Sequence, residues 1–479
     1  MTIGRVVPRE IRLHPAWLLG PLGLLASVAV GLAQGYLQSA YVPLAVVGGL
    51  AAAGWLALVV FRPEWALLAY AFAAVNLNGV DLPTPIGGLR LSPDILLTSV
   101  LMVGMLLRLL LTRQGLSRLP ITFPYLVFLA VPFITLALSP VPLQSVKGAF
   151  RFVGYYALMW LIVDVVRTPP QAMRMVGAIL VSPAIPVLVG FYQLATGGGQ
   201  VIRAGESFNR VYGLAGGPFT LAFYLVLVIP LLLVFLLEQD LGDQGEADGP
   251  RPIYRRRRLL ALLLVGSLLG LLFTFIRGAW LSLSVVVVLL GILRYRRLLF
   301  LFPVSVAGLL WLYAPAQARL AETLSPTSTW FGRLRLWNFA LEWIATSPLV
   351  GVGMKAFEYY YVLLAAPITG AGIPRRVRFL IGQRPHNEVL GFLLDVGIIG
   401  TVAMVAVLFI VVRLAVRVYR RAPQPALRLF ALGFLMSAAG MFIGAMGDNV
   451  FSQPSVAVYF WIMAGLIMAI ERHMLAPTA

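Results

Sequence analysis

The chain has 479 residues, of which 60% are hydrophobic and only 11% are charged, and its formal net charge is +19. An average soluble domain is about 25% charged, so this composition excludes an ordinary soluble enzyme and predicts an integral membrane protein. Most of the lysines and arginines fall in short segments between apolar runs. The positive charge therefore indicates membrane topology, and no nucleic-acid partner is expected.

Apolar stretches of membrane-spanning length recur along the whole chain. A hydrocarbon core of about 30 Å needs roughly 20 apolar residues in helical form, and helices leave no backbone group unsatisfied in lipid. We therefore predict an all-α fold, a polytopic bundle of about twelve to fourteen spans. The predicted spans are 15–34, 42–61, 64–78, 95–113, 121–138, 149–166, 173–195, 217–237, 258–276, 278–297, 299–316, 388–412, 426–446 and 455–471.

These spans leave one long connection. It divides the chain into helices within 1–316, a large loop over 317–387 and C-terminal helices within 388–479, all in a single membrane domain. Within the loop, the stretch from Trp330 to Trp343 predicts an amphipathic helix at the membrane surface. A helix that only caps the bundle is the alternative interpretation. The apolar residues at helical spacing are Leu334, Trp337, Leu341 and Ile344.

Arginine-rich segments predict the orientation in the membrane. Cytoplasmic loops carry the excess of Lys and Arg, which places 255–258, 294–297 and 413–421 inside, together with both termini. His386 is then the one of three histidines that faces outward. The large loop departs from the charge rule, because residues 319–384 contain eight positive and three negative side chains. A basic surface on the outer side needs an anionic partner.

Arg277 is the first candidate for chemistry, because it lies at the tip of a hairpin between two apolar spans. An arginine is costly in lipid and is expected to face protein or a polar cavity. Its planar guanidinium can bind two phosphate oxygens at once. An anchor that reaches lipid headgroups is the alternative.

His386 is the second candidate, and it precedes the long apolar run that starts at Glu388. Histidine accepts and returns protons near neutrality, although a lone histidine is more often structural. Asn387 can cap the first helical turn. Further along, Gly391, Gly397 and Gly400 predict a small-residue face for close helix packing. With no cysteine in the chain and no glycine-rich phosphate loop, neither a metal nor a cofactor is expected.

The spacing His386-Asn387, nine residues, Gly397, two residues, Gly400-Thr401 resembles the signature of the O-antigen ligase family. That family belongs to a larger group with O-antigen polymerases and protein O-oligosaccharyltransferases. Other elements that resemble the family pattern are Arg277-Gly278 at a hairpin tip, Gly332-Arg333 with Trp337, and the segment 348–353. Arg210 with Gly213 resembles a further element, but Gly217-Pro218-Phe219 replaces the Pro-Asn usual there.

The resemblance implies glycan transfer from a polyprenyl (undecaprenyl) diphosphate carrier to an acceptor hydroxyl. The site would lie on the outer face of the bacterial cytoplasmic membrane, among membrane lipids, and would need no metal. His386 would be the catalytic base, while Arg277 and Arg333 would stabilise the leaving diphosphate, and direct displacement predicts inversion. The implied substrate-binding residues, for most of which lipid contact is an equal alternative, are Lys147, Arg151, Arg210, Arg376, Asn387 and Asp448. Asp448 either orients His386 or closes a turn.

Two acceptors and one other class of protein stay open. A ligase would use a lipid-core sugar and a polymerase a second carrier-linked repeat unit, with a chain-length regulator as a possible partner; the motif spacing favours the ligase. A transporter of lipid-linked sugars is the rival, because Pro183 and Pro186 can break a helix and Asp395 lies within a predicted span. No convincing inverted repeat supports it. A peptidoglycan-type polymerase would need a catalytic aspartate in an outer loop.

Overall fold

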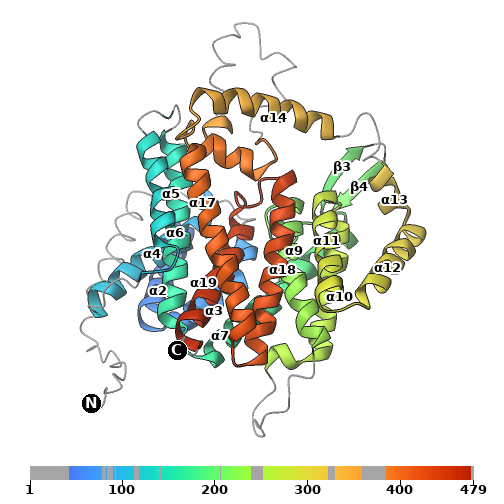
Figure 1. Cartoon of the computed structure of the whole chain (residues 1–479), viewed down its shortest axis with the longest axis horizontal. Helices are drawn as coiled ribbons and strands as arrows, with labels where there is room; N and C mark the ends of the chain where they lie inside the picture. Colours follow the sequence, from blue (N-terminus) through green and yellow to red (C-terminus); the bar gives the residue numbers. More distant parts are fainter. Residues whose placement is uncertain are drawn as a thin grey trace.

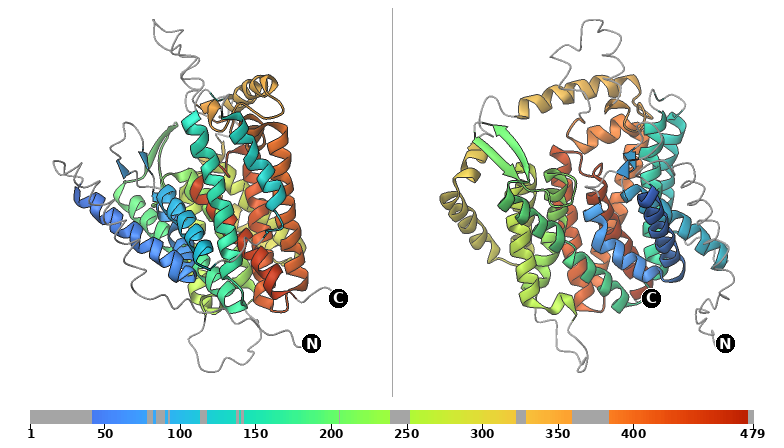
Figure 2. Two further views of the ribbon diagram at one scale, coloured as in Figure 1. Left: turned by 90° about the vertical axis from the view of Figure 1, so that its left-hand side faces the viewer. Right: turned by 180° about the vertical axis from the view of Figure 1, so that it is seen from behind.

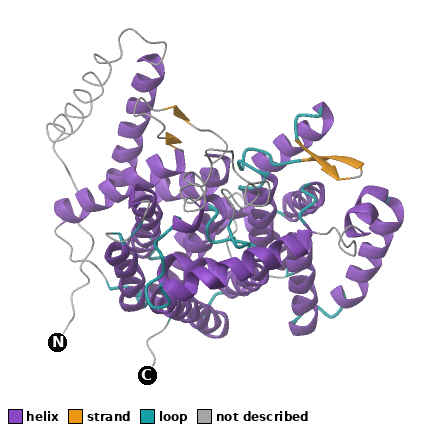
Figure 3. Cartoon of the chain, turned by 90° about the horizontal axis from the view of Figure 1, so that it is seen from above, coloured by secondary structure: helices purple, strands orange, loops and turns teal. Residues whose placement is uncertain are grey.

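The computed structural model describes residues 42–77, 82–83, 90–91, 93–112, 118–136, 139, 142–204, 206–238, 252–321, 329–358 and 384–475. Helices dominate these residues, which confirms the predicted all-α class (Figure 1). Two short antiparallel hairpins are also present. One pairs β1 (Leu82–Pro83) with β2 (Arg90–Leu91), and the other pairs β3 (Gln200–Ala204) with β4 (Glu206–Arg210). The hairpin of β3 and β4 lies at the periphery of the bundle (Figure 3).

The first half of the chain forms α2 (Val42–Phe61), α3 (Pro63–Ala73), the 3-10 turn η1 (Ala74–Leu77), α4 (Pro93–Thr112), α5 (Thr122–Thr135), α6 (Pro142–Val165), α7 (Pro169–Val181), α8 (Ala184–Thr196) and α9 (Pro218–Leu237). The second half forms η2 (Ile253–Arg255), α10 (Arg257–Phe273), α11 (Arg277–Leu293), α12 (Leu298–Leu312), α13 (Ala314–Ala321), α14 (Thr329–Thr346), α17 (Glu388–Arg421), α18 (Pro425–Gly447) and α19 (Pro454–Met474).

Six helices in the described part are long and apolar enough to cross a membrane, or seven if α12 and α13 form one bent span. The predicted twelve to fourteen spans are not confirmed by this criterion. The span expected over 299–316 is interrupted, because α12 and α13 meet at 101°. Pro315 fits only the first turn of a new helix, since it lacks a backbone N–H. The span expected over 64–78 corresponds to α3 and η1, because the α-helix ends at Ala73 and tightens into a 3-10 turn. The span expected over 15–34 lies outside the described residues.

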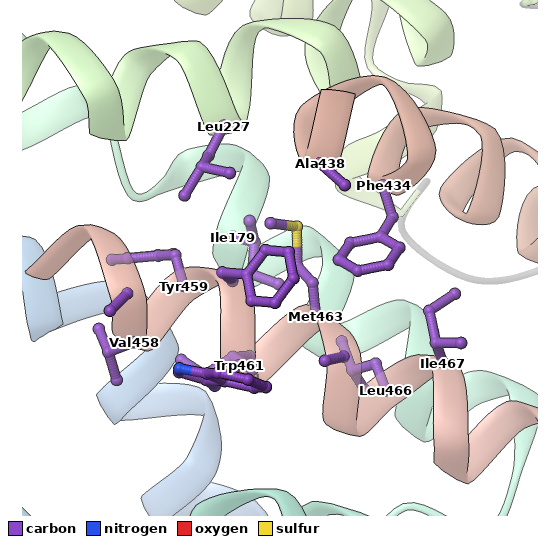
Figure 4. Close-up of a cluster of buried hydrophobic side chains, with 14 of the residues drawn as sticks. Ile179, Leu227, Phe434, Ala438, Val458, Tyr459, Trp461, Met463, Leu466 and Ile467 are labelled. Atoms are coloured by element: carbon purple, nitrogen blue, oxygen red, sulfur yellow. The ribbon is translucent and has the colours of Figure 1, made fainter. Parts of the chain in front are cut away.

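The most apolar helices form the centre of the bundle. Of the apolar 18-residue stretch in each helix, 83% is buried in α9 and 89% in α19, against 44% in α17. A helix that is hydrophobic all round is expected in the interior. Figure 4 shows side chains of α7, α9, α18 and α19 converging there, among them Ile179, Leu227, Phe434 and Met463. Trp461 of α19 lies in the same cluster and is fully buried.

Peripheral helices expose large apolar side chains. No residue of α12 is buried, and Phe300, Val304 and Trp311 are more than two-thirds exposed, at 76%, 70% and 81%. On α5, Phe123 is 79% exposed. Contiguous apolar surface of this kind is rare on soluble monomers. These surfaces, together with the long apolar helices, fit an integral membrane protein.

One helix lies across an end of the bundle instead of along it. The helix expected over Trp330 to Trp343 is confirmed as α14, which crosses the same end in each view (Figures 1 and 2). Its buried face differs from the expected one. Leu336 and Ala340 face inward, whereas Leu334 and Leu341 are 38% and 53% exposed. Phe357 and Leu394 pack with Ala340 and select this face, so α14 caps the bundle.

Candidate active site

His386 stands at the entrance to α17 in a strained backbone conformation. Its φ is +48°, in the left-handed region that residues other than glycine rarely adopt. The next residue, Asn387, is extended and caps the helix, because its side-chain oxygen accepts a hydrogen bond from the Leu390 N–H at 3.1 Å. The cap expected from the sequence is therefore present. It fixes where the helix begins and which way the preceding histidine is turned.

Asp448 holds the imidazole of His386 from the far end of α18. The His386 Nδ1 to Asp448 Oδ1 distance is 2.8 Å, and Asp448 is the residue that caps the C-terminus of α18. The same carboxylate oxygen accepts the Asn449 N–H at 2.9 Å. A carboxylate on Nδ1 favours the tautomer that carries its proton there, so Nε2 keeps the lone pair that can accept a proton. The side chain of His386 remains 32% exposed, which leaves its ring accessible.

Arg333 of α14 approaches the other oxygen of the same carboxylate. Its Nη2 lies 3.6 Å from Asp448 Oδ2, and its side chain is 30% exposed. This separation is longer than a charge-assisted hydrogen bond, which is usually 2.7–2.9 Å. Asp448 thus connects a histidine and an arginine that are 53 residues apart in the chain. The cap formed by α14 brings this arginine to the end of the bundle.

The loop that carries Asp448 is bound tightly to the start of α17. The Asn387 side chain donates to the Met446 carbonyl at 3.1 Å, and the Asn449 side chain donates to the Asn387 carbonyl at 3.1 Å. The buried carboxylate of Glu388 accepts the Phe451 N–H at 2.8 Å and the Ser452 hydroxyl at 3.2 Å. Both polar ends of the Asn387 side chain are therefore engaged by backbone groups. Glu388 was not among the predicted site residues, although it directly follows the His-Asn pair.

Beside His386 lies an open cleft of about 290 Å³. The residues that line it are Lys355, Glu358, Arg384, His386, Asp448, Asn449, Ser452 and Gln453. Arg384 forms an ion pair with Glu358 and a hydrogen bond with Ser452. Burial, reinforced by the positive charge of Arg151, lowers the pKa of Lys355 to about 8. Sequence reasoning counted Lys355 only as part of the loop's charge, and the cleft makes it a candidate site residue.

A break in α17 explains the glycines expected to pack helices closely. Gly397 has φ +62° and ψ −167°, so the helix opens there. The freed N–H groups of Ile398 and Ile399 donate to the Pro348 and Leu349 carbonyls at 2.9 and 3.1 Å. A Cβ on Gly397 would lie 2.4 Å from the Leu349 carbonyl group. The expectation of a helix-packing face is therefore corrected at Gly397, since its partner is the backbone of the loop after α14.

The remaining two glycines serve separate contacts. A Cβ on Gly391 would lie 2.7 Å from the Asn449 amide nitrogen, so this glycine admits the loop that carries Asp448. A Cβ on Gly400 would meet the side chain of Val396 in its own helix at 2.4 Å. Gly391 and Gly397 thus bring two chain segments, the loop that carries Asp448 and the loop after α14, against the first turns of α17.

Arg277 is the first residue of α11, at the same end of the bundle as Arg333. The preceding turn is strained, because Phe275 has φ +53°. The guanidinium of Arg277 is 3.5 Å from the Arg319 carbonyl, and Arg319 in turn donates to the Phe275 carbonyl at 3.3 Å. Neither Arg277 nor Arg333 belongs to the residues that line the cleft. Arg333 therefore contacts Asp448 from outside the lining of the cleft.

The other predicted substrate-binding residues are more dispersed. Arg151 of α6 lines a small cavity with Tyr155 and Ser455, and both Arg151 and Lys147 lie close enough to Lys355 to depress its pKa. Arg210 ends β4, and the next residue, Val211, donates to the Phe273 carbonyl at 3.1 Å, near the turn that carries Arg277. Arg376 lies outside the described residues. Within the described part, no group of three or more His, Cys, Asp or Glu is placed to hold a metal ion.

Residues 260–405 match the family model described as O-antigen ligase. The matched segment begins in α10, contains Arg277, Arg333 and His386, and ends in α17 beyond the break at Gly397. No curated protein matches the chain. The family match supports the assignment that the His-Asn-Gly-Gly-Thr spacing predicted.

Proposed function

We propose, from the match of residues 260–405 to the O-antigen ligase family model, that the chain transfers a glycan from an undecaprenyl-type diphosphate carrier to an acceptor hydroxyl. The domain supports a ligase- or polymerase-type membrane glycosyltransferase. The observation that carries the proposed mechanism is the 2.8 Å contact of His386 Nδ1 with Asp448, which leaves Nε2 as a base.

The acceptor hydroxyl gives its proton to His386 Nε2 as its oxygen attacks the anomeric carbon of the donor sugar. The bond from that carbon to the diphosphate oxygen breaks, and its electron pair stays on the diphosphate. One displacement of this kind inverts the configuration at the anomeric carbon. Asp448 orients the ring and stabilises the imidazolium, and the proton later leaves to water. Base catalysis of this type contributes about 10² to 10⁴ in rate.

The leaving diphosphate acquires negative charge, which Arg333 and Arg277 stabilise. Arg333 suits this role because it is 3.6 Å from Asp448 and 30% exposed, so it retains donors for phosphate oxygens. Fixed guanidinium groups need no rearrangement while the charge develops. Arg277 lies at the same end of the bundle and its planar fork can bind two oxygens. This chemistry proceeds without a metal in our proposal.

The charge distribution supports a site on the outer face of a bacterial cytoplasmic membrane. His386 and Arg277 begin α17 and α11, whereas the other ends of these helices carry Arg294 and Arg421. Arginine clusters of this kind mark the cytoplasmic side. The end of the bundle crossed by α14 would then face outward, and both termini would be cytoplasmic. Residues 317–387 would form the outer loop between membrane helices of 1–316 and 388–479.

The acceptor decides between a ligase and a polymerase, and we favour a ligase that uses a lipid-core sugar. Purified protein in lipid nanodiscs should receive one undecaprenyl diphosphate-linked oligosaccharide and either a lipid-core acceptor or none. The ligase account predicts product only with the lipid-core acceptor. Lengthening of the carrier-linked chain in its absence would contradict the ligase and establish the polymerase alternative, in which a chain-length regulator is the expected partner.

A further inference from the structure

Strained backbone conformations mark the candidate site. Three residues other than glycine have a positive φ in the described part of the chain: Phe275, Lys355 and His386. Such conformations persist only where the surrounding structure enforces them, and they gather at functional sites. His386 is the proposed base, and Phe275 forms the turn before Arg277. Lys355 is the third, and the mechanism above gives it no task.

Two features fix the backbone of Lys355. Gly353, two residues earlier, has φ +102°, and the Lys355 N–H donates to Asp395 Oδ1 at 3.0 Å. Asp395 belongs to α17, one turn beyond Gly391. A leucine or a glycine could donate the same backbone N–H, so the backbone contact does not explain why this residue is a lysine. The strained turn directs the lysine side chain to the lining of the cleft beside His386.

The ammonium of Lys355 forms no ion pair of its own within the described residues. Its nearby charged groups are the cations Arg151, Arg384 and Lys147 and the acids Glu358 and Asp395. Glu358 is already paired with Arg384, and the Asp395 carboxylate accepts the backbone N–H of Lys355. Burial and the adjacent Arg151 lower the pKa of Lys355 to about 8, because the charged form is poorly compensated. An anion in the cleft would supply the missing charge.

The position of Lys355 indicates which substrate brings that anion. Arg277 and Arg333, which we assign to the donor diphosphate, do not line the cleft. Lys355 lines it together with His386, whose Nε2 receives the acceptor hydroxyl in our proposal. A ligand in the cleft therefore approaches the base from the acceptor side.

We propose that Lys355 binds an anionic group of the acceptor, a phosphate or a carboxylate, and so selects acidic acceptors. This inference rests on the proposed glycan transfer and adds the class of acceptor to it. The ammonium forms a charge-assisted hydrogen bond to the anion while the neighbouring acceptor hydroxyl lies at His386. A neutral acceptor would gain nothing from Lys355.

The test compares Lys355→Met, Lys355→Gly and Lys355→Arg with the wild type in nanodiscs. Three lipid-linked disaccharide acceptors serve as probes: one with a phosphate, one with a uronic acid and one neutral. Each is varied at saturating undecaprenyl diphosphate-linked donor, and the donor is then varied at fixed acceptor. Loss of one charged contact should raise KM for the matching acidic acceptor about tenfold or more in the Met and Gly variants. Lys355→Arg should retain most of the affinity.

The two uncharged variants separate charge from backbone strain. Lys355→Met keeps the strained φ, whereas Lys355→Gly removes it and should melt at the same temperature or higher. Similar KM increases in both variants, despite different melting temperatures, would support a role of the charge. The acidic probe that responds identifies phosphate or carboxylate as the ligand group.

Three results would overturn the inference. These are an unchanged KM for both acidic acceptors, an equal change for the neutral acceptor, and a rise in the donor KM instead. Failure of the proposed function has a different signature, because the wild type would then transfer glycan to none of the acceptors, and the inference about Lys355 would fall with it.

Discussion

Asp448 is the central residue of the candidate site, because its carboxylate contacts both His386 and Arg333. Asp448→Asn keeps the shape of this side chain but removes the charge that stabilises the imidazolium. We expect kcat to fall by about 10² or more, with little change in donor affinity. Single-turnover transfer from radiolabelled donor measures the chemical step.

A matched control for this substitution is Glu64→Gln. Glu64 pairs with Arg174, and both side chains are partly exposed at 27% and 53%, so the pair is expected to contribute little. Its turnover should stay within about twofold of the wild type. An equal loss of activity in both variants would show that the Asp448 effect is not specific to the histidine.

Lys355 predicts a pH dependence of acceptor binding. Because its pKa is lowered to about 8, the ammonium is present below pH 8 and is lost as the pH rises through that value. The KM for an acidic acceptor should therefore increase between pH 7 and pH 9, and a bound anion moves this increase towards higher pH. The charged groups near the ammonium are Arg151, Glu358, Arg384, Lys147 and Asp395.

Lys355→Arg supplies the comparison for this prediction, since a guanidinium stays charged across the whole range. Its acceptor KM should be flat from pH 7 to pH 9, and the KM of the wild type for a neutral acceptor should be flat as well. A parallel rise for neutral and acidic acceptors would contradict the assignment.

Among the elements, α17 depends most on one glycine. Gly397→Ala would force a Cβ into a left-handed residue only 2.4 Å from the Leu349 carbonyl group. The backbone strain alone costs about 1–3 kcal/mol, and the displaced loop would shift Lys355 as well. We expect a clear decrease in melting temperature and a loss of activity, both measured on detergent-purified protein.

Gly54→Ala provides the matched change in an unconstrained helix. Gly54 lies in α2, and nothing lies within 4 Å of the position of its added Cβ. Alanine there should be neutral or stabilising, because it loses less conformational freedom in a helix than glycine. If Gly397→Ala were tolerated as well as Gly54→Ala, the break in α17 would not be required.

Sequence periodicity predicted several elements but not their partners. The N-cap at Asn387, the helix now called α14 and the importance of Gly397 followed from local patterns. The buried face of α14 did not follow from local patterns, because apolar residues occur on all sides of this helix. Contacts with Phe357 and Leu394 determine which of them are buried. The loop after α14 that packs against Gly397 lies 46 residues or more before this glycine in the chain. The spacing of residues within α17 therefore could not predict the contact.

At the scale of the whole molecule, the orientation can be tested directly, because the chain contains no cysteine. Single cysteines at Asn338 on α14 and at Gln424 between α17 and α18 occupy exposed positions at opposite ends of the bundle. A membrane-impermeant maleimide should label Asn338→Cys in intact spheroplasts. Gln424→Cys should react only after the membrane is permeabilised. The reverse pattern would place the site on the cytoplasmic side.

Composition predicted the membrane class of the whole molecule more reliably than the number of spans. Helices such as α3 and α5 are apolar but shorter than a membrane span, so hydropathy alone does not fix the number of spans. The motif spacing led to His386 and the arginines. The site residues it could not predict, Lys355 and Glu388, act through contacts with distant segments. The match to the O-antigen ligase family model favours a glycosyltransferase over the transporter alternative.

The most direct test of the central claim is transfer by His386→Gln in a single turnover. Glutamine keeps a polar side chain of similar reach but cannot serve as the base. With undecaprenyl diphosphate-linked oligosaccharide bound to saturation and acceptor added in excess, the account predicts a rate lower by about 10² to 10⁴ at unchanged donor binding. A transfer rate equal to that of the wild type would contradict it.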